Sequence, residues 1–491
     1  MSKVRTALSF AAVSALATGS LLAVSAVPAL AADCVGGVDN DFDGDGVRDI
    51  AMGSPRDVVS GYDAMGAVYV SQSRTGESFA ITQDQIGDLL MVDAEFGMAV
   101  SSYDGNGDGC SDLVVGAPGH NDYAGAVYVI PGSPEGLQLD GTSIYTQDSA
   151  GYPGAAEPGD NFGYAVAAGN TGSGEPFLII GSPGEKIDKS WGEGAFHYSR
   201  GGTTQIVHQD SVGIPGATEK NDYYGSFVAA TPTHFIVAAY GEAQGDKAGA
   251  GAVNIFSHKW TSGVPTSLGS IHQDTTGISG AAETGDEFGA SVSAIAYRPA
   301  GSSTTGSLFA VGSPGEALRD NTAPWAGSAY TLYVSSTGKV TQHGYYHQDV
   351  TGVYGGAEAD DAFGLQVKLA QNGDGAYATP ETAMMAVMVA GEEGSNYGYG
   401  ANAVFRFDTT IGGGDSYLVS GTYGLPTEAF EHAACPAPSS GKHLIIGNSI
   451  EGAYGVPWAS LRAGSPVGDV IRFDLQGESN VEPNGGCSDV L

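Results

Sequence analysis

A Gln-Asp pair recurs along the chain, and this recurrence constrains the fold more than any other feature of the sequence. Each copy is preceded by Thr or His and followed by an aromatic-glycine pair, 12 residues after the Asp in the first copy and 14 in the other four. The Gln-Asp pairs are Gln83-Asp84, Gln147-Asp148, Gln209-Asp210, Gln273-Asp274 and Gln348-Asp349. The aromatic-glycine pairs are Phe96-Gly97, Phe162-Gly163, Tyr224-Gly225, Phe288-Gly289 and Phe363-Gly364. This regularity indicates one fold of repeated units rather than several unrelated domains.

Two β-rich elements repeat seven times each. Apolar segments that end in a turn lie at 50–55, 113–118, 178–183, 235–241, 308–314, 385–392 and 444–448. Each is followed by a segment that begins with Gly or Ala, at 66–70, 125–129, 194–198, 251–256, 327–334, 401–407 and 468–473. Short strands with turn residues between them indicate an all-β fold, and the repeat unit contains four of them. We therefore expect an all-β, seven-bladed β-propeller of four-stranded antiparallel blades over residues 32–491. The alternative, a pair of β-sandwiches, would not repeat at this period.

The sequence of these elements resembles FG-GAP repeats. The Phe-Gly pairs stand at one end of the unit and Gly116-Ala117-Pro118 at the other. FG-GAP repeats build the seven-bladed heads of integrin α subunits, and a similar array occurs in GPI-specific phospholipase D. The resemblance covers nearly the whole mature chain but weakens in the last two blades, where Phe430-Glu431 and Gly447-Asn448-Ser449 replace the motifs. It implies a seven-bladed propeller of a secreted, bacterial type.

Two segments place oxygen-bearing side chains at alternate positions, a pattern that favours Ca²⁺. Positions 1, 3, 5 and 9 carry the side-chain oxygens, position 6 is Gly, and the carbonyl of position 7 offers a further ligand. The first set is Asp41, Asp43, Asp45, Val47 and Asp49; the second set is Asp104, Asn106, Asp108, Cys110 and Asp112. Position 12 is Met52 or Val115 rather than Glu, which excludes an EF-hand. In FG-GAP proteins such a loop joins the first two strands of a blade and binds Ca²⁺, so we expect two structural Ca²⁺ sites; solvated Asp-Gly turns are the alternative.

The first 31 residues have the pattern of a secretory signal peptide. Lys3 and Arg5 precede an apolar stretch over 7–27, and Ala29-Leu30-Ala31 forms a cleavage site. We expect a secreted, extracellular mature protein with no membrane span; an uncleaved anchor is the alternative reading. An exported chain with four cysteines is expected to form two disulfides. In the implied propeller, Cys34–Cys110 and Cys435–Cys487 would each fasten one end of the chain.

Charge and the long loops suggest what kind of partner the chain binds. With 55 acidic residues against 19 Lys and Arg, the net charge of −36 argues against nucleic acid and anionic membranes. In the implied topology the Ca²⁺ loops mark the lower face, and the second-to-third-strand loops and the fourth-to-first-strand connections lie on the upper face. Aromatic residues in these upper loops suit a glycan or a protein partner, although they could instead pack on neighbouring loops. The candidates are Tyr62, His120, Tyr123, Trp191, Trp325, Tyr397, Tyr399, Tyr454 and Trp458.

The fourth-to-first-strand connections repeat Glu-x-x-Asp, at Glu157/Asp160, Glu219/Asp222, Glu283/Asp286 and Glu358/Asp361. Capping of backbone N–H groups is the first interpretation, and a cation funnel at the channel mouth is the second.

No sequence motif for a hydrolase, a zinc protease or a nucleotide-binding loop is present in the chain. The preferred hypothesis is therefore a secreted, Ca²⁺-binding recognition or adhesion module for a surface glycan or protein. The alternatives are a glycan- or lipid-active propeller enzyme and a docking subunit of a secreted assembly.

Overall fold

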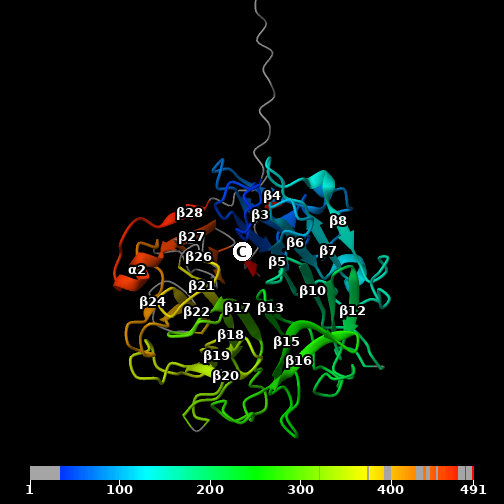
Figure 1. Ribbon diagram of the computed structural model, residues 1–491. Coiled ribbons are helices and arrows are strands. Elements are labelled where there is room, and N and C mark those ends of the chain that lie inside the picture. The colour runs from blue at the N-terminus through cyan, green and yellow to red at the C-terminus, as the bar shows by residue number, and fades with distance from the viewer. Residues whose placement is uncertain are drawn as a thin grey trace, which may run out of the picture. The chain divides into compact units, whose positions relative to one another are not determined.

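The computed structural model describes residues 34–188, 190–319, 321–372, 375–391, 400–426, 435–437, 443–448, 452–473, 481–482 and 489–490. Asp33–Leu491 form one compact unit in which seven four-stranded antiparallel sheets are the blades of a β-propeller. The innermost strands of neighbouring blades contact each other around a closed ring (Figure 1). The predicted fold class is confirmed, whereas the predicted signal peptide lies outside the described residues.

The blades follow one another along the chain, and blades 2 to 7 each have their strands in sequence order from the centre outward. Blade 2 contains β5 (Ala99–Tyr103), β6 (Asp112–Ala117), β7 (Ala126–Ile130) and β8 (Ser143–Tyr145). Blade 3 contains β9 (Val166–Asn170), β10 (Pro176–Ser182), β11 (Ala195–Arg200) and β12 (Thr203–Val207). Blade 4 contains β13 (Val228–Ala230), β14 (His234–Ala239), β15 (Ala252–Thr261) and β16 (Val264–Ile271). Blade 5 contains β17 (Ser291–Tyr297), β18 (Gly306–Ser313), β19 (Ser328–Val334) and β20 (Val340–Tyr346), and blade 6 contains β21 (Val367–Gln371), β22 (Ala383–Val389), β23 (Ala401–Arg406) and β24 (Ser416–Leu418).

Blade 1 is assembled from both ends of the chain. Its outer strands are β1 (Ile50–Ser54), β3 (Ala67–Ser71) and β4 (Ser78–Ile81), and its innermost strand is β30 (Asp489–Val490). A second small ladder pairs β2 (Val58–Val59) with β29 (Val481–Glu482). The ring is therefore closed by hydrogen bonds between its first and last strands, a feature that the sequence repeats left undetected.

Blade 7 corrects one of the strand predictions. It contains β25 (Cys435–Ala437), β26 (His443–Asn448), β27 (Gly452–Pro457) and β28 (Ile471–Phe473). The third strand was expected at 468–473, but that segment holds the fourth strand. The helix α2 (Trp458–Ala463) separates the third and fourth strands. Because blades 1 to 6 have no α-helix at this place in the described residues, the repeat pattern assigned the fourth strand to the third position.

Short helical turns complete the described structure. They are α1 (His120–Tyr123) and the 3₁₀ turns η1 (Gln83–Ile86) and η2 (Leu139–Gly141).

The hydrophobic core lies mainly between adjacent blades. One cluster packs Ile236 and Ile255 of blade 4 against Phe309 and Leu332 of blade 5, all of them fully buried. The glycine of the Gly-Ala-Pro element permits this close approach, because a Cβ on Gly116 would lie 2.0 Å from the carbonyl oxygen of Gly163 in the next blade. The two glycine motifs of the repeat thus mark where backbones of neighbouring blades meet.

The Gln-Asp motif fastens each blade to the next. Gln147 follows the last strand of blade 2, and its Nε2 donates a 2.6 Å hydrogen bond to Glu185 Oε2 in blade 3. Gln209 and Gln273 make the same contact with Glu242 and Glu316. The adjoining aspartate holds the connection that follows it. Asp148 Oδ1 accepts a hydrogen bond from the Ala156 N–H, and Asp210 and Asp274 make the same contact eight residues further along the chain. The motif is therefore architectural.

Candidate calcium loops and upper-face aromatic site

The first acidic loop folds its aspartates inward. Asp41 accepts hydrogen bonds from the N–H groups of Asp45 and Gly46, at 3.0 and 2.8 Å. Asp49, at the start of blade 1, accepts from Phe42 and Ser73 at 2.8 and 2.7 Å. The carboxylates of Asp41, Asp43 and Asp49 lie within 4.8 Å of one another, and all three residues are buried.

This loop meets the chemical requirements of a hard cation. Asp43 Oδ2 is buried and has no hydrogen-bond partner, so one carboxylate oxygen remains available to a ligand. Burial raises the pKa of Asp41 and Asp43 and raises that of Asp49 to about 6, because each carboxylate loses water and faces other negative charges. Oxygen donors gathered in this way suit Ca²⁺, which takes six to eight of them. Asp45, which bonds the Val47 N–H at 2.7 Å, and the Val47 carbonyl border the same turn.

The second acidic loop repeats the turn but does not gather its carboxylates as tightly. Asp104 accepts from the Gly107 and Gly109 N–H groups, and Asp112 accepts from Gly105 and Gly132. Asn106 and Asp108 bond the N–H groups two residues further on. In the described part of the chain, only Asp108 of this loop joins a metal-sized group, and its companions are Cys34 and Cys110. Those sulfurs form a disulfide and cannot act as thiolate ligands, so a cation here would need the oxygens to move closer.

The Cys34–Cys110 disulfide joins the two acidic loops, as predicted. Its Cα atoms are 5.2 Å apart, and it links residues 76 positions apart in the sequence. Gly44 of the first loop lies directly against it, since a Cβ there would be 2.7 Å from the Cys34 Cα. The Val35 N–H donates to the Gly44 carbonyl at 3.1 Å. The second predicted pair is not tested, because Cys487 and the side chain of Cys435 lie outside the description; the backbone places Cys435 in β25 itself rather than after it.

The upper-face loops contact the fourth-to-first-strand connections. The Trp191 Nε1–H donates to the Gly159 carbonyl at 3.2 Å, and the Ala362 N–H donates to the Trp325 carbonyl at 2.8 Å. Since these loops leave the opposite strand ends from the acidic loop between β5 and β6, the two faces of the propeller differ as the topology predicts.

An aromatic cluster lies on this face between blades 3 and 4. Trp191, 44% exposed, packs edge-on against Tyr223 with ring centroids 5.4 Å apart. Tyr223 stacks on Tyr240 at 5.3 Å with nearly parallel rings, and Tyr240 contacts Phe227 at 6.1 Å. Phe227 in turn contacts Tyr164. Only Trp191 of this cluster was expected from the sequence.

A variable position in the repeat could have identified Tyr223. The residue before each aromatic-glycine pair has a positive φ between 50° and 58°. These residues are Glu95, Asn161, Tyr223, Glu287 and Ala362. Left-handed backbone is unusual for a residue as large as tyrosine and often marks a functional position. Because all five connections share this backbone, the turn belongs to the repeat, and only its side chain distinguishes Tyr223 from the other four residues.

The other predicted aromatic residues are distributed unevenly. Tyr62, Tyr123 and Trp325 are exposed, and His120 is largely covered beside Asp88, with a 3.3 Å contact between its Nε2 and the carboxylate. Tyr397 and Tyr399 lie outside the described residues.

Tyr454 and Trp458 were wrongly placed in an exposed loop. Tyr454 is within β27 and Trp458 begins α2, and both are buried in the core between blades 6 and 7. Because blade 7 inserts a helix after its third strand, these aromatics fill the core and do not form part of the upper-face site.

The Glu-x-x-Asp repeats are caps, in agreement with the first interpretation. The N–H groups of Glu157, Glu219, Glu283 and Glu358 donate to the Oδ2 atoms of Asp160, Asp222, Asp286 and Asp361, at 2.7, 2.6, 2.5 and 2.6 Å. Burial raises the pKa of Asp160 to about 6 and that of Asp222 to about 8. Burial also raises the pKa of Glu185 to about 7 and of Glu316 to about 8, with repulsion from a neighbouring aspartate as the next cause.

Comparison with known proteins places the repeat in a family. Residues 96–130, which span most of blade 2, match the FG-GAP repeat. Integrin alpha-3 of Cricetulus griseus is 31% identical over 177 residues, which are 34% of this chain and 15% of that protein. Integrin alpha-PS2 of Drosophila melanogaster is 34% identical over 152 residues, 29% of this chain and 11% of the relative. Phosphatidylinositol-glycan-specific phospholipase D of Bos taurus is 30% identical over 165 residues, 29% of this chain and 18% of the relative.

The chain therefore matches less than a fifth of the length of these relatives. The solved structure of Sqt1 from Chaetomium thermophilum aligns over 80% of this chain and 75% of its own length, with 13% identity and a TM-score of 0.36. None of the helices in the described ranges has the length and apolar character needed to cross a membrane.

The matched repeat, the partial similarity to integrin α subunits and the seven blades are mutually consistent. A propeller of this kind suggests a binding or adhesion module. This chain is a seven-bladed β-propeller whose residues 96–130 match the FG-GAP repeat.

Proposed function

We propose that this chain is an extracellular recognition module in which Ca²⁺ stabilises the lower face and a glycan or protein binds the upper face. The observation that carries the recognition role is the aromatic cluster in which the exposed Trp191 packs on the half-buried Tyr223 and Tyr240. Aromatic rings that remain accessible offer a large contact area at a small entropic cost.

The net charge of the chain limits the chemical class of its partner. The chain is strongly acidic, so nucleic acid and anionic lipid surfaces would be repelled. Burial raises the pKa of Tyr240, and the negative charge of Glu287 adds to this effect, which places a carboxylate near the aromatic cluster. Neutral or basic partners are therefore favoured over acidic ones.

The Ca²⁺ role rests on the first acidic loop. Three buried carboxylates converge there, and one of their oxygens has no partner in the protein. Asp41, Asp43 and Asp49 would hold the ion, and it would neutralise charges that otherwise repel each other. The second loop would hold a second ion with Asp104, Asn106, Asp108 and Asp112, whose oxygens would move closer to the ion.

A binding experiment tests the recognition role. The purified chain is applied to a glycan array and to a pull-down from cell surfaces. Trp191→Ala is tested beside it, with Ile144→Ala as the control, which removes an exposed hydrophobic side chain from β8 of blade 2. We expect saturable wild-type binding that Trp191→Ala weakens by about tenfold or more, as for an interface anchor. Retention of full binding by Trp191→Ala would place the site elsewhere, and chemical turnover of a bound glycan would favour an enzyme.

A further inference from the structure

Blade 6 lacks a side chain that blades 1 to 5 use to fill the space under their connecting loop. Three residues after the glycine that begins the third strand, blades 1 to 5 carry a polar side chain that is nearly or fully buried. These residues are Tyr69, Tyr128, His197, Asn254 and Tyr330. The same position in blade 6 is Ala403.

In the other blades this side chain is hydrogen-bonded in place. His197 Nε2 lies 2.8 Å from the Pro153 carbonyl, and Asn254 Nδ2 donates to the Pro215 carbonyl at 3.2 Å. The hydroxyls of Tyr128 and Tyr330 accept from the Gln of the Gln-Asp motif. The position therefore acts as a plug between the third strand and the connection that enters the blade.

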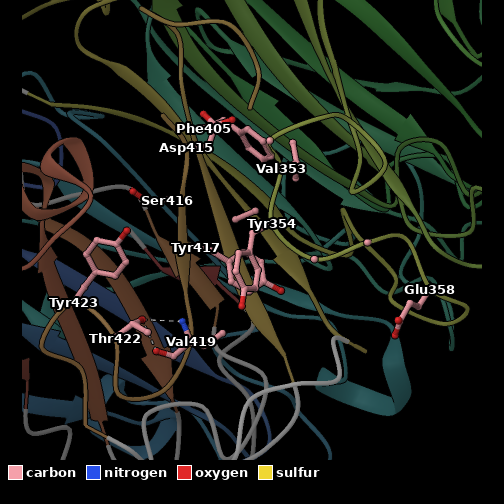
Figure 2. Close-up of a pocket in the computed structure, with 14 residues that line it drawn as sticks. Val353, Tyr354, Glu358, Phe405, Asp415, Ser416, Tyr417, Val419, Thr422 and Tyr423 are labelled. Atoms are coloured by element: carbon pink, nitrogen blue, oxygen red, sulfur yellow. Dashed lines mark hydrogen bonds between the residues drawn. The ribbon is translucent and has the colours of Figure 1, made fainter. Parts of the chain in front are cut away.

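The missing plug leaves an open cavity. It measures about 850 Å³ and is lined by Ala403 together with residues of the blade 5–6 connection and of β24 (Figure 2). That volume lies within the range of small-molecule sites. In register, Ala403 faces Tyr417 of β24, so the alanine opens the space in front of that ring.

The connection departs from the repeat at the same place. Where the preceding connections carry Pro153, Pro215 and Ser279, this one carries Tyr354. The Tyr354 ring lies 4.4 Å from the Tyr417 ring, and 66% of the residue is exposed. It therefore does not fill the cavity but forms an aromatic wall at its opening, with the two rings side by side in Figure 2.

The remaining lining combines apolar residues, among them Val353, Phe405 and Val419, with polar ones. Asp415 and Glu358 supply carboxylates, and Ser416 and Thr422 supply hydroxyls. The described lining itself contains no Lys, Arg or His. Arg319 lies beside Gly356 of the lining and Arg406 acts on Asp415, but both guanidinium groups are already paired, with Asp349 and Asp408. The unpaired carboxylates of the lining therefore disfavour an anionic ligand. Asp415 is held in place, because its Oδ2 accepts a 2.6 Å hydrogen bond from the Gly412 N–H.

We infer that this cavity is a binding site for a neutral sugar. The C–H face of a pyranose would stack on the exposed ring of Tyr354, which packs on Tyr417, and its hydroxyls would donate to Asp415 and Glu358. The site is separate from the upper-face cluster of Trp191. The inference rests on the proposed recognition role only in the class of ligand that it assigns.

The repeat itself provides the test variants. Ala403→Tyr restores the plug of blades 1, 2 and 5, and Tyr354→Ser restores the residue found at Ser279. Binding of cellobiose and of N,N′-diacetylchitobiose is measured by saturation-transfer NMR and calorimetric titration. We expect at least one of them to bind wild type with a Kd on the order of 1 mM, and each variant to weaken that binding by about tenfold or more. Ile144→Ala, which removes an exposed side chain from β8 of blade 2, serves as the control and should bind these probes as wild type does.

Several results would overturn the inference. They are failure of both sugars to saturate wild type at tens of millimolar, wild-type affinity in the folded Ala403→Tyr protein, or wild-type affinity in Tyr354→Ser. Ala403-dependent binding of choline in place of sugar would also overturn it, since it would show a cation site. If Trp191→Ala loses array binding but still binds cellobiose, the result supports both sites. If sugar binds the cavity but no partner binds the upper face, the proposed function alone is overturned.

Discussion

The backbone N–H of Ser111 donates a 2.9 Å hydrogen bond to the carbonyl of Asp41 and so joins the two acidic loops directly. Asp41 begins the first loop, and Ser111 lies in the last turn of the second. Because the Cys34–Cys110 disulfide spans the same junction, a change in one loop is expected to reach the other. The lower face of blades 1 and 2 is thus one structural unit.

The first prediction concerns Asp43. Asp43→Asn keeps the shape of the side chain but removes a carboxylate, so we expect the Ca²⁺ affinity of EDTA-treated protein to fall by about tenfold, which equals about 1.4 kcal/mol. Isothermal titration calorimetry measures the change. Asp63→Asn removes the same charge at an exposed position and should leave the titration unchanged; equal affinities in the two variants would contradict the assignment of the site.

The second prediction concerns the disulfide. Replacement of both cysteines, Cys34→Ser with Cys110→Ser, should lower the free energy of unfolding by roughly 2–5 kcal/mol, since the bond closes a long loop. The gain in stability on adding Ca²⁺ should also shrink, because Cys34 packs on Gly44 of the first loop. Urea unfolding of the variant with and without Ca²⁺ checks both effects. A variant that loses stability but keeps the full Ca²⁺ gain would show that the loops are independent.

The third prediction concerns pH. Burial raises the pKa of Glu316 and Asp222 to about 8 and of Glu185 to about 7, above the values near 4 of an unfolded chain. The folded state binds these protons more tightly, so this contribution to stability is complete below about pH 4 and is lost as the pH rises to 7–8.

The urea midpoint of the Ca²⁺-saturated protein should therefore fall between pH 5 and 8. Glu316→Gln, which cannot ionise, should flatten part of that decline; each unit of pKa difference removed corresponds to about 1.4 kcal/mol. Glu135→Gln, at an exposed position, is the matched control. A decline of the same steepness in Glu316→Gln would mean that Glu316 is not the titrating group.

The repeats made most of the fold predictable, and the failures have physical causes. Seven apolar segments fixed the blade number, but the inner strand of blade 1 comes from Asp489–Val490, two residues with no motif of their own. Trp458 was misplaced because a helix follows the third strand of blade 7, where the repeat is weakest.

The candidate sites were predictable to different degrees. The alternating aspartates specified the first acidic loop, since a short turn brings such positions together. The sequence of a single repeat predicts neither the stacking of Tyr223 on Tyr240 nor the space beside Ala403. Tyr223 needs the unusual backbone of its position, and the cavity is visible only once the plug residues of other blades are aligned.

Calorimetric unfolding of the EDTA-treated protein tests the central claim, a propeller stabilised by Ca²⁺, most directly. With affinities on the order of 10⁻⁴–10⁻³ M, about 10 mM Ca²⁺ should stabilise each occupied site by about 1.5–3 kcal/mol and raise the Tm by a few degrees. Mg²⁺ at the same concentration controls for ionic strength and should raise the Tm less. An unchanged Tm on adding Ca²⁺ would contradict the account.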